Sequence, residues 1–153
     1  MIDSETAWIR LVIVLAVVLS LGSCEPAFPA EVGGDRESSE ISQEEGVYSV
    51  LGEAGPSYEE RLAVAFALQN RGHLGGVYGL KVTRTRSYEA SAWQNACRSW
   101  NEAKEGIVAD VTNGATHWLS DYDLKHCKAS LTAFRFRMVE TAYIASTHFY
   151  KDK

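Results

Sequence analysis

Apolar residues follow a helical spacing through the middle of the chain and alternate with polar residues toward its end. A first helix is expected to begin near Ser42 and to end where Gly52 and then Gly55-Pro56 break the pattern. Its apolar face consists of Val47, Val50 and Leu51. Glu53 therefore lies at or just past the C-terminal end of this helix, where the helix dipole disfavours a negative charge. This position is a poor one for a structural glutamate, but it suits an acid whose pKa has to rise.

The segment after Gly55-Pro56 predicts a central helix. Ser57 and Glu60 form a capping box. Residues 61–70, RLAVAFALQN, are apolar on every side, as in a buried helix, and Arg71-Gly72 closes it. A third helix is expected from Ser87 to about Lys104, ended by Gly106. One stripe along it is apolar and consists of Trp93, Ala96, Cys97, Trp100 and Ala103.

Strands are expected mainly in the last part of the chain. Residues 73–86, HLGGVYGLKVTRTR, predict a loop with strand character, and residues 110–123 are rich in turn residues with a short strand around Thr116 to Leu119. The tail from Phe134 to Tyr150 alternates in places between apolar and polar residues, which predicts strands. With helices first and strands last, the expected fold class is α+β.

The first 23 residues are expected to be a signal peptide. Residues 11–21, LVIVLAVVLSL, have the length of a signal-peptide core and are shorter than the roughly 20 residues that span a bilayer. They lead into LGSC at 21–24, which is similar to the bacterial lipoprotein box, whose cysteine is lipidated and becomes the new N-terminus. We therefore expect export to the periplasm or cell envelope and a lipid anchor at Cys24. A short signal-anchor is the alternative, because acids in residues 1–10 offset Arg10.

Charge is unevenly distributed along the chain. Residues 1–46 carry nine acidic and two basic side chains, whereas residues 47–153 carry 13 basic and 11 acidic ones. Residues 24–46 are acidic and poor in large apolar side chains, as expected of a flexible tether that cannot bury enough surface to fold. Residues 47–153 are then the folded domain. Its slight positive charge suits an acidic polymer as partner, but it is too weak to predict nucleic-acid binding.

The cysteines bear on the compartment and on stability. If Cys24 is lipidated, Cys97 and Cys127 remain as a pair in an oxidising environment. A bridge between them would close a loop of about 30 residues and add roughly 3 kcal/mol of stability. Two buried thiols that never meet are the alternative.

Four stretches, in this order, resemble the SleB-type cell-wall hydrolases. The first is EAGPSYEERLAVAFALQNR at 53–71, which is similar to the family's opening Glu-Ala-x-Gly-Glu segment and its Ala-Val-Ala helix ending in Asn-Arg. The others are GGVYGLK at 75–81, DVTNGATHW at 110–118 and THFYK at 147–151. The match extends over residues 47–150. The chain departs from the family where the segment after Glu53 is shorter and where Glu60 occupies a glycine position.

This resemblance implies a lysozyme-like α+β domain, helix-rich with a small sheet toward the C-terminus. The family's catalytic residue is the first glutamate of the opening segment, which falls on Glu53. The implied reaction cleaves the bond between N-acetylmuramic acid and N-acetylglucosamine, as in a lytic transglycosylase or a muramidase. Glycan strands of peptidoglycan are then the partner, and no cofactor is required. Wall remodelling and phage-encoded lysis fit this activity alike.

A single acid is sufficient for such chemistry. A glutamic acid with a raised pKa delivers a proton to the leaving oxygen. In a lytic transglycosylase the 6-hydroxyl of the muramic acid replaces a second carboxylate, so Glu53 acts first as acid and then as base. Candidate substrate-binding residues are Tyr78, Thr116, His117 and Trp118, because aromatic rings stack on sugars and polar groups after a Gly-Ala turn can hydrogen-bond them. Core packing explains Tyr78 and Trp118 equally well, and Asn70 and Arg71 are expected to fix the fold.

Two other functions stay open. His117, Asp121, Asp123 and His126 could bind zinc in a peptidoglycan amidase, although HWLSDYDLKH lacks the spacing of a helical zinc motif and the two aspartates are expected in a turn. A wall-binding lipoprotein that has the fold without the activity is favoured by the altered segment after Glu53.

Overall fold

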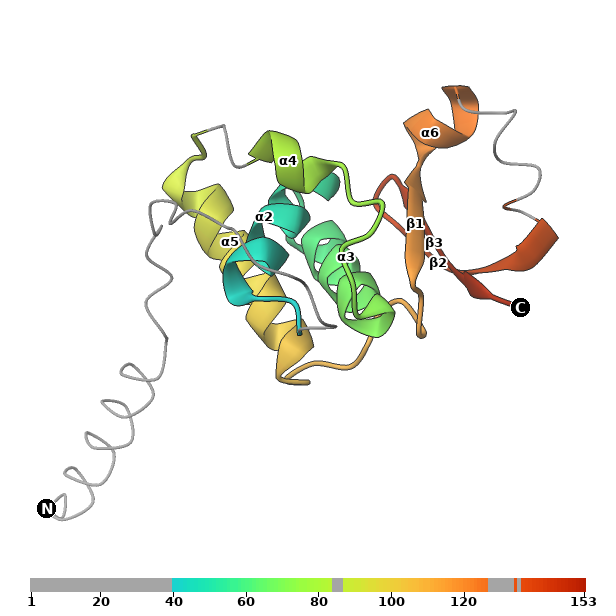
Figure 1. Cartoon of the computed structure of the whole chain (residues 1–153), viewed down its shortest axis with the longest axis horizontal. Coiled ribbons are helices and arrows are strands. Elements are labelled where there is room, and N and C mark those ends of the chain that lie inside the picture. The colour runs from blue at the N-terminus through green and yellow to red at the C-terminus, as the bar shows by residue number, and fades with distance from the viewer. Residues whose placement is uncertain (1–39, 84–86, 127–133, 135) are drawn as a thin grey trace, which may run out of the picture. The chain divides into compact units, whose positions relative to one another are not determined.

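The computed structural model describes residues 40–83, 87–126, 134 and 136–153 (Figure 1). The predicted signal peptide, the anchor at Cys24 and most of the predicted tether lie outside these residues. Among the described residues, no helix is both long enough and apolar enough to cross a membrane. The first described helix, α2, spans Gln43–Glu53 and so begins inside the segment expected to be the tether.

Helices make up the first part of the fold. α3 (Tyr58–Arg71) packs along α5 (Ala90–Lys104), and α2 packs against α5 and against the short helix α4 (Gly79–Thr83). α3 also contacts two strands of the sheet, so it is the central element, with α5 on one side and the sheet on another (Figure 1). A further short helix, α6 (Asp121–His126), follows the first strand.

Three antiparallel strands form the sheet in the order β1-β3-β2. They are β1 (His117–Ser120), β2 (Met138–Ile144) and β3 (Thr147–Asp152). The central strand β3 pairs Phe149 with Trp118 of β1, and a bulge interrupts its pairing with β2 between Glu140 and Ala142. The expected α+β class and the expected C-terminal strands are confirmed.

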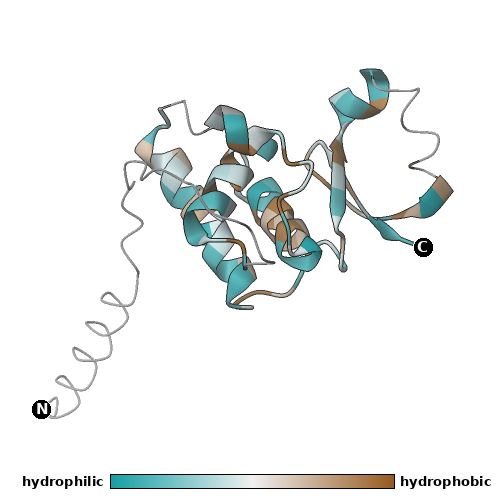
Figure 2. Cartoon of the chain, viewed as in Figure 1, coloured by the Kyte–Doolittle hydropathy of each residue, from teal (hydrophilic) through white to brown (hydrophobic). Residues whose placement is uncertain are grey.

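The core matches the apolar pattern closely. Val47 and Val50 on α2 are fully buried, and so are Trp100 on α5 and Phe149 on β3. Every residue of α3 from Glu60 to Leu68 is buried, and Figure 2 shows the apolar character of this helix. The prediction of a buried central helix is therefore confirmed. Trp93, on the apolar stripe from which burial was expected, is only half-buried and packs edge-on against Tyr48 with 5.1 Å between ring centroids.

Capping side chains fix the helix ends. Ser42 and Ser57 accept backbone hydrogen bonds from residues three positions on, and Gly72 ends α3 with a left-handed φ of 72°. Glu60 does not complete the expected capping box among the described residues. Its carboxylate is buried and accepts a hydrogen bond of 2.5 Å from the Thr147 hydroxyl on β3 instead. The glutamate thus links α3 to the sheet.

Three expectations for local structure were wrong. Residues 79–83 form the helix α4 and not a strand-like loop. α5 begins at Ala90 and not at Ser87, because Glu89 is its extended N-cap residue. The aspartates expected in a turn open α6, where the Ser120 hydroxyl accepts from the Asp123 amide (3.1 Å) and Asp123 accepts from the Ser120 amide (3.0 Å). This reciprocal pair caps the helix.

Cys97 is buried on α5 and is disulfide-bonded. The alternative of a buried free thiol is therefore excluded for this residue. Its predicted partner, Cys127, lies outside the described residues, as does Cys24. The pairing of Cys97 with Cys127 stays a prediction.

Candidate active site

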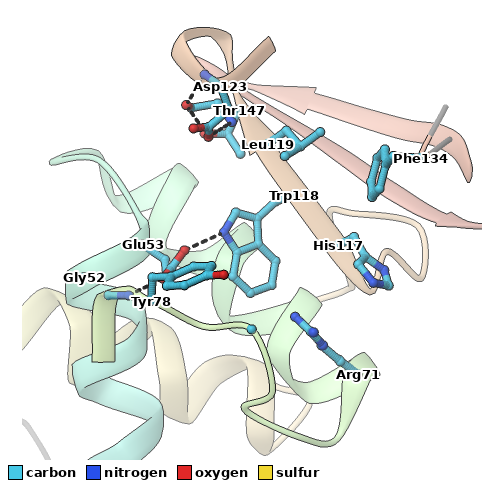
Figure 3. Close-up of a pocket in the computed structure, with 13 residues that line it drawn as sticks. Gly52, Glu53, Arg71, Tyr78, His117, Trp118, Leu119, Asp123, Phe134 and Thr147 are labelled. Carbon is cyan, nitrogen blue, oxygen red and sulfur yellow. Dashed lines mark hydrogen bonds between the residues drawn. The ribbon is translucent and has the colours of Figure 1, made fainter. Parts of the chain in front are cut away.

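A cleft of about 640 Å³ lies between the helical part and the sheet, and Glu53 is on its wall (Figure 3). Its walls come from the C-terminal ends of α2 and α3, from the start of α4, and from β1, α6 and β3. The lining residues are Gly52, Glu53, Arg71, Gly76, Tyr78, Gly79, His117, Trp118, Leu119, Ser120, Asp123, Phe134 and Thr147. Four of the five predicted site residues are therefore in one cleft.

Glu53 is the last residue of α2, as the break at Gly55-Pro56 predicted. Its side chain is half-buried and accepts two hydrogen bonds from N–H donors. Oε1 accepts from the backbone amide of Gly79 at 2.5 Å, and Oε2 accepts from the indole Nε1 of Trp118 at 3.3 Å. The two donors come from α4 and from β1, so both walls of the cleft orient this carboxylate.

Two glycines allow the shorter of these bonds. A Cβ on Gly79 would overlap the backbone of Gly52, and a Cβ on Gly52 would overlap the backbone of Gly79. α2 and α4 therefore touch backbone to backbone at this point. This close approach brings the first amide of α4 within reach of the Glu53 carboxylate, which a larger residue at either position would prevent.

Two aromatic residues flank the carboxylate. Tyr78 is 82% exposed, so core packing does not explain it, and its ring lies beside Glu53 at the rim of the cleft (Figure 3). Trp118 is half-buried on β1 with its indole nitrogen directed at Glu53. Its backbone position is fixed by pairing with the buried Phe149. Both rings are thus available to stack on a sugar.

Basic side chains lie on the other side of Trp118 in the same view (Figure 3). Burial lowers the pKa of the Arg71 guanidinium, while the charge of Glu53 acts in the opposite direction. The pKa of His117 is lowered first by burial and then by the positive charge of Arg71, with smaller contributions from other basic residues. His117 is therefore a neutral imidazole near neutral pH.

Thr116, the fifth predicted residue, does not line the cleft. Its hydroxyl is 2.9 Å from Nδ1 of His117, and its amide donates to the Tyr150 carbonyl on β3. Thr116 thus helps to orient the His117 ring, which itself lines the cleft. Its direct contact with a substrate stays a prediction.

A polar turn holds β1 in place. The Asp110 carboxylate accepts from the Thr112 amide (2.7 Å) and the Gly114 amide (2.9 Å), and Asn70 at the end of α3 donates to it (2.9 Å). Asn70 also donates to the Ala115 carbonyl at 3.1 Å. The prediction that Asn70 fixes the fold is confirmed. This turn carries the chain from the helices directly into β1 and so positions His117 and Trp118.

The four residues considered for zinc have separate partners. His117 pairs with Thr116, and Asp123 caps α6. Asp121 accepts from Tyr143 and contacts His148, and His126 contacts the Tyr122 carbonyl. Over the described ranges, no three His, Cys, Asp or Glu side chains come together as a possible metal site.

Sequence reasoning missed several residues of the cleft. Arg71 was expected only to fix the fold. It does donate to the Gly75 carbonyl, but its guanidinium also lines the cleft. Asp123 and Phe134 line it as well, with Phe134 packing edge-on against Tyr150 at 5.1 Å. No sequence signal marks Arg71 as a cleft residue, because Glu53 precedes α3 and Arg71 is at the other end of this helix.

Comparisons with protein-family models, with curated proteins and with solved structures return no match. The resemblance to SleB-type hydrolases therefore depends on the four sequence stretches alone.

Proposed function

We propose that this chain is a peptidoglycan glycosidase that cleaves the bond between N-acetylmuramic acid and N-acetylglucosamine, with Glu53 as its general acid and base. The proposal includes the lysozyme-like fold that the sequence resemblance implies. The observation that carries it is the Glu53 carboxylate, which lies in a cleft and is held by donors from both walls. A glutamate in a cleft can protonate a glycosidic oxygen, and aromatic neighbours can stack on the sugar rings beside it.

The two carboxylate oxygens of Glu53 have different tasks in this mechanism. Oε1 takes the shorter bond, from Gly79, and is held in place. Oε2 has the longer contact, to Trp118, and is the oxygen that carries the proton to the leaving group. As the glycosidic bond breaks, positive charge develops on the muramic acid ring, and the ionised carboxylate stabilises it. Glu53 then accepts the proton of the attacking hydroxyl.

The carboxylates that line the cleft indicate which group attacks the muramic acid ring after the bond breaks. Asp123 is the other carboxylate among its described lining residues, and the bonds of this residue to Ser120 cap α6. A capping carboxylate is poorly suited to act as nucleophile or base. The 6-hydroxyl of the muramic acid therefore attacks, which makes the enzyme a lytic transglycosylase that forms anhydro-muramic ends.

The test uses the full chain, kept in solution with a non-ionic detergent and incubated with purified sacculi. Glu53→Gln is compared with Asp123→Asn, which removes a second carboxylate charge from the same cleft. Products are identified by mass spectrometry, and folding is checked by circular dichroism. We expect anhydro-muramic products from the wild type and from Asp123→Asn, and none from Glu53→Gln.

Other outcomes would identify other functions. Reducing ends would show that water attacks in place of the 6-hydroxyl. New free amino groups without new glycan ends, lost with a chelator, would identify an amidase. Binding of sacculi without release of soluble fragments, unchanged in Glu53→Gln, would identify a wall-binding protein and overturn the proposal.

A further inference from the structure

We propose that Arg71 and His117 form a subsite that binds a carboxylate of the glycan strand, on the far side of Trp118 from Glu53. This inference rests on the proposed function and specifies the substrate class of the same cleft. The strand of peptidoglycan offers such a group in two ways. A muramic acid without a peptide has a free lactyl carboxylate, and a muramic acid with a peptide stem has carboxylates on the stem.

The charge of Arg71 is not neutralised by a close acid in the described part of the chain. Its guanidinium donates to the Gly75 carbonyl, which is a neutral acceptor, and has no carboxylate within ion-pair distance among those residues. Its Nε is buried there without a hydrogen-bond partner. Glu53 acts on it only at longer range. A partly desolvated cation that lines a cleft attracts an anion of the ligand, and the planar guanidinium fork fits a carboxylate.

The surroundings of His117 are also positive. Burial is the largest cause that lowers the pKa of this imidazole, and the charge of Arg71 is the next, while Asp152 opposes them. With the Thr116 hydroxyl at Nδ1, Nε2 is the other ring nitrogen, and it donates to a bound carboxylate in the tautomer that carries its proton there. The positive charge of Arg71 thus acts on His117 on one wall, whereas the opposite wall carries Glu53.

This separation of charge orients a strand. A sugar that stacks on Trp118 has the acid on one side and the basic subsite on the other (Figure 3). A neutral glucosamine ring can stack on Trp118 but has no carboxylate for the basic subsite. A muramic acid with a carboxylate can stack on Trp118 and bind the basic subsite as well. The subsite would therefore select for muramic acid at one position of the strand.

Binding is measured with the full chain carrying Glu53→Gln, so that no probe is cleaved, in detergent and at low salt. The three probes are N-acetylchitotetraose, a peptide-free tetrasaccharide of alternating glucosamine and muramic acid, and the same tetrasaccharide carrying Ala-Glu stems. Arg71→Gln removes the charge, and Arg71→Lys retains it without the fork. Arg98→Gln is the matched control, because Arg98 is exposed on α5 and pairs there with Glu102.

We expect at least one carboxylated probe to bind about tenfold more tightly than N-acetylchitotetraose, as one charge-assisted pair gives. Arg71→Gln should remove this preference while the affinity for N-acetylchitotetraose stays the same, which also shows that the variant folds. Arg71→Lys should retain part of the preference, and Arg98→Gln all of it. Preference for the peptide-free probe assigns the lactyl carboxylate as ligand, and preference for the stem-bearing probe assigns a stem carboxylate.

Equal affinity for all three probes, or a preference that survives Arg71→Gln, would overturn the subsite and leave the glycosidase proposal intact. If no probe bound at all, and the wild type released nothing from sacculi, the proposed function would fail and the subsite with it.

Discussion

The indole of Trp118 has two possible tasks at Glu53, and they can be separated. The ring can stack on a sugar, and its Nε1–H donates to Oε2 of the carboxylate. Trp118→Phe retains an aromatic face and removes the donor. Because a hydrogen bond to a charged group contributes about 1.5–3 kcal/mol, we expect the rate of product release from sacculi to fall roughly tenfold or more. The affinity for sacculi should change little.

Tyr78→Phe is the control for this prediction. It removes a hydroxyl at the rim of the same cleft and retains the ring, and among the described residues that hydroxyl has no hydrogen-bond partner. Its activity should stay near that of the wild type. Equal losses in the two variants would mean that the Trp118 donor has no special role at Glu53.

Single residues of the cleft were predictable to different degrees. Glu53 could be found because its place at a helix end is unusual for a carboxylate, and His117 and Trp118 because they follow a turn that the sequence marks clearly. Arg71 could not be assigned in the same way. An arginine at the end of a buried helix can bond to backbone carbonyls or face a cavity, and the choice depends on β1, which comes more than forty residues later. Thr116 precedes β1 and does not line the cleft, and its hydroxyl and amide bond to His117 and to β3, contacts that the sequence does not mark.

At the scale of elements, the contact between α2 and α4 determines whether Glu53 is held. We expect Gly79→Ala to force the two helices apart, because the added Cβ would overlap the backbone of Gly52. Overpacking of this kind costs about 1–3 kcal/mol, seen as a lower midpoint in urea unfolding. Activity on sacculi should be lost even where the variant is still folded, because the amide of residue 79 then no longer reaches the carboxylate.

Gly75→Ala is the matched control for Gly79→Ala. It adds a Cβ four residues earlier, where only the His73 ring is close, and a side chain can move away. We expect nearly wild-type stability and activity. A Gly79→Ala variant with full activity would show that the Gly79 amide is dispensable to Glu53.

The hydrogen bonds in the turn before β1 predict that the free energy of unfolding depends on pH. Burial by itself would raise the pKa of Asp110, but hydrogen bonds from Thr112, Asn70 and Gly114 outweigh it and lower the pKa below its usual value. A carboxylate with a lowered pKa in the folded state stabilises the fold above the unfolded value of about 3.9. That contribution is lost as the pH falls through the folded pKa. Asp110→Asn should therefore cost about 1–3 kcal/mol near neutral pH and progressively less below about pH 4.

The measurement for Asp110 is the free energy of unfolding of both proteins across this pH range. Glu105→Gln serves as the control, since it removes an exposed carboxylate outside this turn. A difference between wild type and Asp110→Asn that stays constant down to acid pH would contradict the hydrogen-bonded carboxylate.

The long helices were predictable from the sequence and the short helices were not. α2, α3 and α5 have two or more turns, so their apolar period and their caps are both visible. α4 and α6 have five and six residues, which is too short to display a period. α4 was mistaken for a strand-like loop because Val77 and Val82 suggest extended structure, whereas the packing of Gly79 on α2 decides otherwise. Tertiary contact, and not local preference, determines these two helices.

At the scale of the whole molecule, the cleft exists only because two halves of the chain meet. Glu53 belongs to the helical half and Trp118 to the sheet, 65 positions apart in sequence. The buried bond between Glu60 on α3 and Thr147 on β3 joins the same two halves, 87 positions apart. Sequence alone predicted the elements of each half but not this juxtaposition, since no local pattern encodes which strand faces the end of α2.

The disulfide of Cys97 is expected to tie these halves together further. Cys97 lies on α5, which packs on the central helix α3. Of the other cysteines in the sequence, Cys127 follows α6, so a bridge to it would enclose the turn, β1 and Trp118 within one covalent loop. A loop of about 30 residues contributes roughly 3 kcal/mol. We expect Cys127→Ser to lower the free energy of unfolding in urea by about this amount, and reduction of the wild type with dithiothreitol to have the same effect.

Cys24→Ser distinguishes a bridge between Cys97 and Cys127 from a bridge between Cys97 and Cys24. If Cys97 pairs with Cys127, Cys24→Ser leaves stability unchanged, and reduction has no further effect on Cys127→Ser. Peptide mapping without reduction should then recover the peptides around Cys97 and Cys127 as one species. A loss of stability in Cys24→Ser, with Cys127→Ser unaffected, would contradict the proposed pairing and mean that the bridge joins α5 to the N-terminal segment, outside the loop that carries the cleft.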